Sequence, residues 1–382
     1  MQFTFTHEQE EFRTVLRRYF AEASPPAKVR RAMETEAGWD AASWRAMNEQ
    51  LGLCGVAVPE AYGGQGFGFV ELGIVLEEMG RALFCAPYFA SAVLAANAIL
   101  NTATETQKKV LLPGIASGET IATLAWVESG GDWSPSATET IAAPSGPRFT
   151  LSGTKHFVLD GASADTFLVL ARAKGTKGDT GLSLFLVRSN AQGVTRQPVK
   201  TLDPTRKLAR IRFENAQADL IGEEGAAAAA TVKTLQQAAI ALANEMVGGA
   251  ERLRESALEF AKMRVQFGRP IALFQSMKHK QAEMLLDVEL AKSAAYYAAA
   301  AAAEGDPDLP ALASLAKASA SEAYLQTAIH TIQIHGGIGF TWDNDTHLWF
   351  KRAKSSEAFL GDASLHREQM MRAWDDEKRE RA

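Results

Sequence analysis

The stretch from residue 226 to the C-terminus constrains the fold most, because it reads as a succession of long helices. Alanine, leucine, glutamate, lysine and glutamine, which favour helices, dominate it. Short joins at "FGRPI", "GDPDLP" and "HGGIGF" interrupt the pattern with the glycine and proline that commonly stop and restart helices. Long helices with short connections predict an antiparallel four-helix bundle.

Two regions with different residue patterns precede this bundle. Residues 1–117 carry apolar side chains at helical spacing and predict an N-terminal helical domain. Residues 118–225 hold short β-branched and aromatic segments between turn clusters, and predict an antiparallel β domain. Because no βαβ repeat occurs, we predict an α+β fold with domains 1–117, 118–225 and 226–382, and exclude a doubly wound nucleotide fold.

Charge and composition narrow the class of protein. The formal net charge of −5 argues against a nucleic-acid partner, whose affinity comes mainly from neutralised phosphates. Cys54 and Cys85 lack metal-type spacing and fit buried thiols in a reducing compartment. The N-terminal residues lack the pattern of a secretory signal, and no apolar run has the roughly eighteen residues that span a bilayer. We therefore expect a cytoplasmic protein without a membrane span.

Two corners between the C-terminal helices carry polar or flexible residues. "RVQFGRPIALFQ" places Arg264, Arg269 and Gln275 around a corner where Gly268 would follow one helix and Pro270 would begin the next. These donors suit a phosphate or pyrophosphate, although an ordinary helix connection shows the same pattern. The glycines of "QIHGGIGF" allow close approach of a neighbouring helix or a flat ligand. No metal-ligand set accompanies the histidines of this region, so no metal is expected.

The β domain offers aromatic side chains near its turns. Trp126, Trp133 and Phe157 could form a wall for a planar cofactor or pack in the core. The sequence has no GxSxG motif and no Cys-His nucleophile arrangement, which argues against a hydrolase.

Taken in order along the chain, these segments resemble the acyl-CoA dehydrogenase family. The resemblance rests on "VPEAYGGQGFGFVELGIVLEEMGRAL", "GTKHFVLDGASAD", "RVQFGRPIALFQ" and "QIHGGIGF". It implies an N-terminal helical domain, a central β-barrel and a C-terminal four-helix bundle that hold FAD, with assembly to a homo- or hetero-oligomeric dimer of dimers. It also implies an acyl-CoA substrate, electron-transfer flavoprotein as the acceptor and oxidation to trans-2-enoyl-CoA. "TLDPTRKLARIRF" and "TWDNDTHLWFKRA" look closest to actinobacterial-type members that act on bulky or steroid-derived thioesters.

The resemblance also assigns cofactor contacts by position. In the family the flavin ring lies between the β domain and the bundle, and the adenine end reaches the neighbouring subunit. The residues expected to contact FAD are Trp126, Val127 and Phe157 at the ring, Arg264, Gln266, Phe267 and Gln275 at the pyrophosphate of the partner chain, and Gln333 and Gly337 at the adenosine.

The catalytic base of the family is missing from its commonest position. A glutamate usually precedes the glycine that is Gly361 here, but Leu360 stands there and cannot accept a proton. Some relatives carry the base near the place of Ala238 instead. Glu245 lies about two helical turns further along and is the first candidate, with Asp362 the second. The alternatives are an ion pair within the bundle for Glu245 and a helix N-cap for Asp362.

Two hypotheses follow from these departures. Val127 and Leu159 stand where the family usually offers threonine hydroxyls to the flavin, whereas the segments that serve a neighbouring chain's FAD are intact. The chain is either a self-sufficient acyl-CoA dehydrogenase with a relocated base, or a subunit without chemistry of its own that lends FAD contacts to a catalytic partner. The reaction class is common to both.

Overall fold

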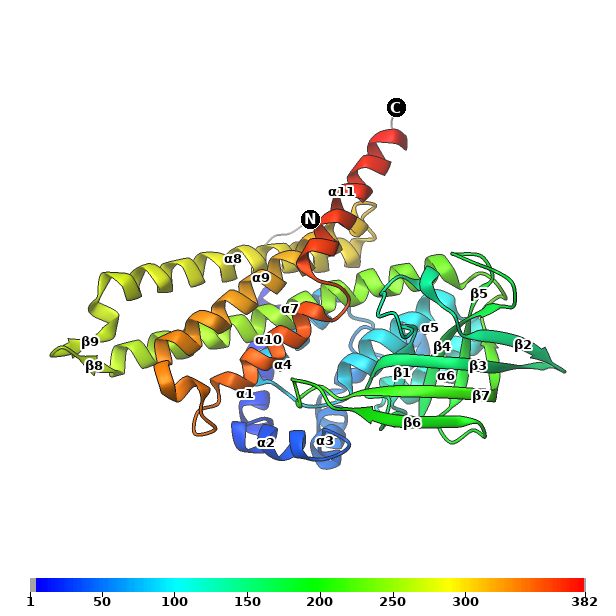
Figure 1. Cartoon of the computed structure of the whole chain (residues 1–382), viewed down its shortest axis with the longest axis horizontal. Helices are drawn as coiled ribbons and strands as arrows, with labels where there is room; N and C mark the ends of the chain where they lie inside the picture. Colours follow the sequence, from blue (N-terminus) through cyan, green and yellow to red (C-terminus); the bar gives the residue numbers. More distant parts are fainter. Residues whose placement is uncertain (1–4, 381–382) are drawn as a thin grey trace. The chain divides into compact units, whose positions relative to one another are not determined.

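The computed structural model describes residues 5–380, whose backbone forms two compact units (Figure 1). The unit that we call the helical unit comprises the described residues up to Arg30, then Phe69–Phe84, and the chain from Ala239 onward. The unit that we call the sheet unit comprises Arg31–Gly68 and Cys85–Ala238. Each unit therefore draws on separate stretches of sequence, and the three predicted domain limits stay predictions.

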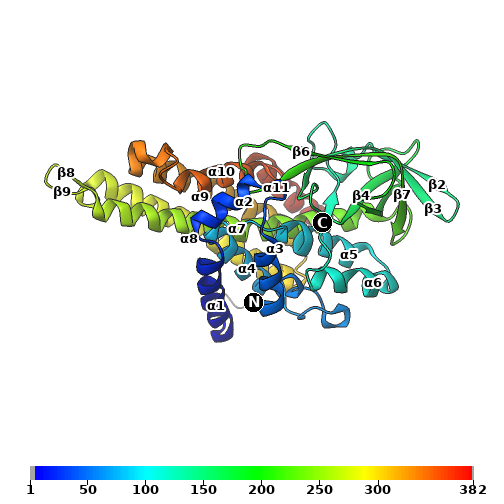
Figure 2. The same ribbon diagram turned by 90° about the horizontal axis from the view of Figure 1, so that it is seen from below.

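The helical unit is built mainly from long helices, and Figures 1 and 2 show α7, α8 and α9 running side by side. A capping box of Thr6 and Gln9 begins α1, in which each side chain accepts a hydrogen bond from the other residue's backbone N–H. The elements of this unit are α1 (His7–Ala23), α2 (Pro26–Glu34, its first half), α4 (Phe69–Ala82), α7 (Ala227–Met263, from Ala239), β8 (Val265–Gln266), β9 (Arg269–Pro270), the 3-10 turn η5 (Ile271–Leu273), α8 (Gln275–Glu304), α9 (Leu309–His335), the 3-10 turn η6 (Gly336–Phe340), α10 (Thr346–Ala358) and α11 (Ala363–Glu380).

Glycine allows α4 and α7 to pack backbone against backbone. A Cβ at Gly80 would lie 1.9 Å from the carbonyl oxygen of Glu245, and a Cβ at Gly248 would lie 1.8 Å from that of Glu77. Any larger residue at either position would push the two helices apart.

The predicted four-helix count is corrected, because α7 to α11 are five α-helices in the described part of the chain. The helix expected after the glycine corner ends at Ala358, and a new helix begins at Ala363. Leu360 and Gly361 have φ values of +64° and +101°, which no right-handed helix accommodates.

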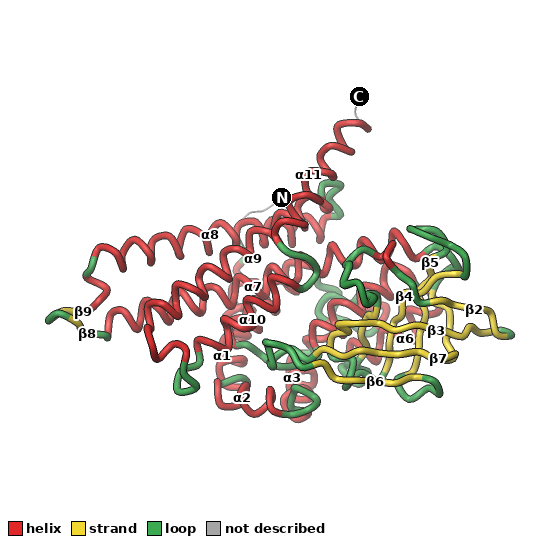
Figure 3. Tube along the Cα trace, viewed as in Figure 1, coloured by secondary structure: helices red, strands yellow, loops and turns green. Residues whose placement is uncertain are grey.

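The sheet unit places seven strands beside short helices, and Figure 3 shows the strands gathered in one sheet. Burial alternates along β7, as expected for a strand with one face on the core. The elements are α3 (Ala41–Leu51), the 3-10 turns η1 (Leu53–Gly55), η2 (Glu60–Tyr62) and η4 (Pro135–Ala137), a π-helix η3 (Phe89–Ala95), α5 (Ala96–Thr102), α6 (Glu105–Ala116), β1 (Ala122–Ala125), β2 (Ile141–Ser145), β3 (Arg148–Leu159), β4 (Thr166–Ala173), β5 (Leu182–Arg188), β6 (Val194–Val199) and β7 (Leu208–Ile221).

The predicted antiparallel pattern holds for only part of this sheet. The strand order is β1-β4-β2-β3-β7-β5, with β6 on β7 and a further β4–β5 pairing. β4 runs parallel to both β1 and β2, whereas the other pairings of this sheet are antiparallel. The sheet is therefore mixed, and its closure into a barrel stays a prediction.

Candidate functional site

The corner between α7 and α8 is an exposed β-hairpin. β8 and β9 pair through Val265 with Pro270 and through Gln266 with Arg269. Phe267 and Gly268 form the two-residue turn with φ values of +52° and +76°, as a type I′ turn requires. The expected helix stop at Gly268 and start at Pro270 are therefore wrong: α7 already ends at Met263, and the chain makes a hairpin before α8 begins.

This hairpin presents aromatic and cationic groups without burying them. Phe267 is 92% exposed, and Arg264, Gln266 and Gln275 are exposed as well. The Arg269 guanidinium carbon lies 4.2 Å from the centre of the Phe274 ring, which is a cation–π contact. Forked donors and a bare aromatic ring are groups that can contact the phosphates and rings of a dinucleotide.

The glycine corner after α9 is likewise open. Gly336 ends α9 with a φ of +66°, and an added Cβ at Gly336 or Gly337 would meet nothing within 4 Å. Gln333 is exposed on the last turn of α9, where its side-chain oxygen accepts a 2.6 Å hydrogen bond from Lys280. The backbone here leaves room for a flat group, and the adenosine contact of Gln333 and Gly337 stays a prediction.

The three residues expected at the flavin ring differ in exposure. Trp126 is buried, and its indole N–H donates to the carbonyl of Trp133 over 3.2 Å. Val127 is buried, and its carbonyl accepts from the backbone N–H of His156 over 2.8 Å. Phe157 is 37% exposed and has a φ of +53°. Within the sheet unit, Phe157 thus leaves part of its ring exposed, whereas the side chains of Trp126 and Val127 are buried.

Both base candidates are held by structural contacts. Glu245 lies on α7 and its Oε1 is 2.7 Å from a guanidinium nitrogen of Arg352 on α10, with both side chains buried. The Asp362 carboxylate accepts the backbone N–H of Leu365 over 2.8 Å at the start of α11. The ion pair and the N-cap that the sequence left open as alternatives are therefore present, and a role of either carboxylate as the base stays a prediction.

The turn that carries Leu360 is fixed by two polar side chains that the sequence analysis missed. Lys317 on α9 is fully buried and donates to the carbonyls of Gly361 (2.9 Å) and Glu357 (3.2 Å). His366 on α11 donates, as the Nε2–H tautomer, to the carbonyl of Leu360 over 3.0 Å. Burial, and next the charge of Lys317, lower the pKa of His366 to about 4. The sequence signal for Lys317 is a single lysine among the small residues of the helical segment "SLAKASAS".

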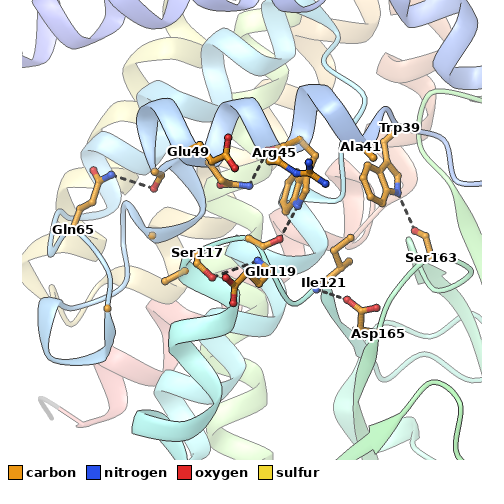
Figure 4. Close-up of a pocket in the computed structure, with 17 residues that line it drawn as sticks. Trp39, Ala41, Arg45, Glu49, Gln65, Ser117, Glu119, Ile121, Ser163 and Asp165 are labelled. Carbon is orange, nitrogen blue, oxygen red and sulfur yellow. Dashed lines mark hydrogen bonds between the residues drawn. The ribbon is translucent and has the colours of Figure 1, made fainter.

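A separate pocket of about 830 Å³ lies within the sheet unit (Figure 4). Figure 4 shows the indole N–H of Trp39 directed at Ser163, and the backbone N–H of Ile121 at the carboxylate of Asp165. None of the residues predicted to bind FAD or to act as the base lines this pocket.

Two kinds of feature are absent from the described part of the chain. No helix there has the length and apolar character needed to cross a bilayer. No group of three or more His, Cys, Asp or Glu side chains in this part of the chain could hold a metal ion.

The fold and the exposed corners point to an enzyme that binds a dinucleotide, and comparisons define the family. Models described as the N-terminal, middle and C-terminal domains of acyl-CoA dehydrogenase match residues 6–119, 123–216 and 224–374. The chain belongs to the acyl-CoA dehydrogenase family. It is thus an FAD-dependent oxidoreductase of the class that acts on CH–CH bonds.

Individual relatives agree over nearly the whole length. The chain is 33% identical to acyl-CoA dehydrogenase IpdE2 of Mycobacterium tuberculosis, over 92% of this chain and 93% of the relative. A structure of the steroid ACAD Tcur3481-Tcur3483 superposes with a TM-score of 0.87 at 31% identity, covering 97% and 98%. Butyryl-CoA dehydrogenase from Megasphaera elsdenii gives a TM-score of 0.91 at 26% identity, covering 98% and 100%.

Proposed function

We propose that this chain takes part in the α,β-dehydrogenation of an acyl-CoA thioester to the trans-2-enoyl-CoA, as one subunit of a heteromeric enzyme. A single observation carries the proposal: the position of the family's base holds Leu360, on a turn fixed by Lys317 and His366. The two candidate carboxylates are engaged elsewhere, Glu245 with Arg352 and Asp362 at a helix start. A partner chain would then supply the base.

The reaction removes a proton from the α-carbon and a hydride from the β-carbon of the thioester. FAD, when bound, supplies the acceptor for the hydride. The chain's own contribution is binding: Arg264, Arg269 and Gln275 offer donors to the phosphates, and Phe267 offers an exposed ring. The side chain of Leu360 is apolar and can neither take up nor deliver a proton at any pH.

Glu245 supports a second candidate function, that of a self-sufficient dehydrogenase with a relocated base. It is a buried carboxylate on α7, and glutamate side chains in buried sites serve as general bases in enzymes. To act, it would have to exchange its 2.7 Å contact with Arg352 for the α-proton of the substrate. Asp362 would have to give up the cap of α11 in the same way.

We infer a bulky or steroid-derived acyl group as the substrate class, supported by similarity to a solved steroid ACAD. That structure's name joins two proteins, Tcur3481 and Tcur3483, which supports a heteromeric assembly for this chain too. The proposal also includes electron-transfer flavoprotein as the electron acceptor and a dimer-of-dimers assembly, both of which the family resemblance implies. It includes a cytoplasmic location, which the sequence pattern predicts.

The test compares the chain alone with the chain plus a sister subunit that carries the glutamate before the glycine. Both samples receive FAD and are titrated without oxygen with short, branched and steroidal acyl-CoA thioesters. We expect the flavin absorption to bleach only when the sister subunit is present. If the chain alone bleaches the flavin and Glu245→Gln abolishes this bleaching, the result would support the relocated base instead.

A further inference from the structure

The carboxylate of Glu128 is a junction of hydrogen bonds in the sheet unit. Its Oε1 accepts from the ammonium of Lys155 (2.5 Å), from the backbone N–H groups of Glu139 (3.0 Å) and Thr140 (2.9 Å), and from the Thr140 hydroxyl (2.9 Å). Glu128 is 7% exposed and Lys155 is fully buried. One carboxylate oxygen therefore joins the end of β1, the start of β2 and the middle of β3.

These contacts close the loop of residues 129–139. Glu128 precedes this loop and Thr140 follows it, so the carboxylate holds the two ends together where no strand pairing does. Arg172, buried on β4, holds the returning limb through the carbonyls of Thr138 and Ser136. The loop is thus fixed by charged side chains from the sheet and has little freedom of its own.

The same network reaches the segment expected at the flavin. Lys155 donates a second hydrogen bond, of 3.0 Å, to the carbonyl of Trp126. The indole N–H of Trp126 in turn donates to the carbonyl of Trp133 inside the loop. Lys155 thereby holds the Trp126 carbonyl on one side of Val127 and the Glu128 carboxylate on the other. The side chain of Val127 has no hydrogen-bonding group of its own.

Burial of an ion pair costs free energy unless the two groups are well aligned and their remaining donors and acceptors form hydrogen bonds. Burial lowers the pKa of Lys155 to about 8, against the opposing charge of Glu128. Burial alone would raise the pKa of Glu128, but Lys155 and the backbone donors bring it below its ordinary value. Both groups are therefore charged at neutral pH. The sheet unit keeps this ion pair despite the free-energy cost of burying two charges.

We propose that Glu128 and Lys155 are positioning residues for FAD: they fix Trp126–Glu128 and the 129–139 loop in the shape that receives the flavin ring. This inference rests on the proposed function in that FAD is the cofactor, and on the expected contact of its ring with Trp126, Val127 and Phe157. It goes further in assigning a preformed flavin-binding surface to this chain's own sheet unit, although Val127 and Leu159 replace the usual hydroxyl groups.

The test is FAD binding by the full chain with Lys155→Met, measured by flavin fluorescence, together with amide hydrogen exchange of the peptide covering 129–140. We expect about tenfold weaker FAD binding and faster exchange in this peptide. Arg148→Met is the matched control, because Arg148 lies on the same strand and forms an exposed pair with Asp219. It should change neither readout.

Thr140→Val covers the case in which Lys155→Met does not fold, because it removes only one hydrogen bond to Glu128. We expect it to weaken FAD binding by a few-fold and to speed exchange in the same peptide. Unchanged FAD affinity in a variant whose loop exchanges faster would overturn the inference, as would a wild-type chain that binds no FAD. Neither readout involves acyl-CoA, so failure here is distinct from failure to bleach the flavin.

Discussion

Two connections of the helical unit differ in how far their side chains and carbonyl groups are buried. One is the Val265–Pro270 hairpin, and the other is the Glu357–Asp362 turn. The hairpin leaves Phe267 92% exposed and Arg269 at the surface. The turn buries Leu360 and gives its carbonyls to buried Lys317 and His366.

The exposed groups of the hairpin are accessible to a ligand, whereas the polar groups of the turn already bond within the fold. A leucine in the left-handed region costs about 1–2 kcal/mol, and the turn keeps Leu360 there because the surrounding hydrogen bonds outweigh that cost. Changes in the turn should therefore affect folding, whereas changes in the hairpin should affect binding.

Removal of Lys317 should have the largest effect. Lys317→Met leaves the carbonyls of Glu357 and Gly361 and the hydroxyl of Ser321 without this buried donor, so we expect the free energy of unfolding to fall by about 4 kcal/mol. Urea denaturation followed by circular dichroism measures it. Lys354→Met, the same change at an exposed lysine of α10, should cost under about 0.5 kcal/mol. If Lys317→Met and Lys354→Met lowered the free energy of unfolding equally, the contrast between the buried turn and the exposed surface would be wrong.

Protonation of His366 should have the next largest effect. Its pKa is lowered to about 4 in the fold from 6.5, so between these values the unfolded chain binds a proton that the folded chain does not. The contribution is complete above pH 6.5 and is lost as the pH falls, reaching about 3 kcal/mol of lost stability at pH 4. Denaturation midpoints across this range measure it, and His366→Gln should flatten the profile. A profile unchanged by that substitution would contradict the burial of a neutral imidazole.

Substitution of Phe267 should hardly affect folding. Phe267→Ser removes a ring that packs on little of its own chain, so we expect a change in stability within about 0.5 kcal/mol. FAD binding by the assembled protein should weaken by about tenfold, because an exposed contact is lost. Val110→Ser, at another exposed apolar residue, is the control for both measurements. A large loss of stability would show that the hairpin packs within its own chain.

Much of the fold could be predicted, because its signals are local. The long helices follow from alanine-rich periodic segments, and the strands of 118–225 from β-branched runs between turns. The parallel pairing of β4 with β1 and β2 could not be predicted, since pairing depends on contacts between distant segments. The break at Leu360 was also hidden, because its positive φ is stabilised by residues 43 and 6 positions away in sequence.

The site was predictable where it depends on exposed motifs. "RVQFGRPIALFQ" and "QIHGGIGF" indicated two open corners, although the first is a hairpin rather than a plain helix connection. An ion pair within the bundle was one alternative for Glu245, but no sequence signal identified its partner. Glu245 meets Arg352 from a position 107 residues away, and only the packed helices bring the two together.

The central claim is that this chain has no base of its own for the α-proton of a thioester. The most direct measurement is incorporation of deuterium at the α-carbon of an acyl-CoA incubated in D₂O with the FAD-loaded chain alone. We expect exchange no faster than in buffer, and faster exchange once the sister subunit is added. Rapid exchange by the chain alone, lost in Glu245→Gln, would contradict the account.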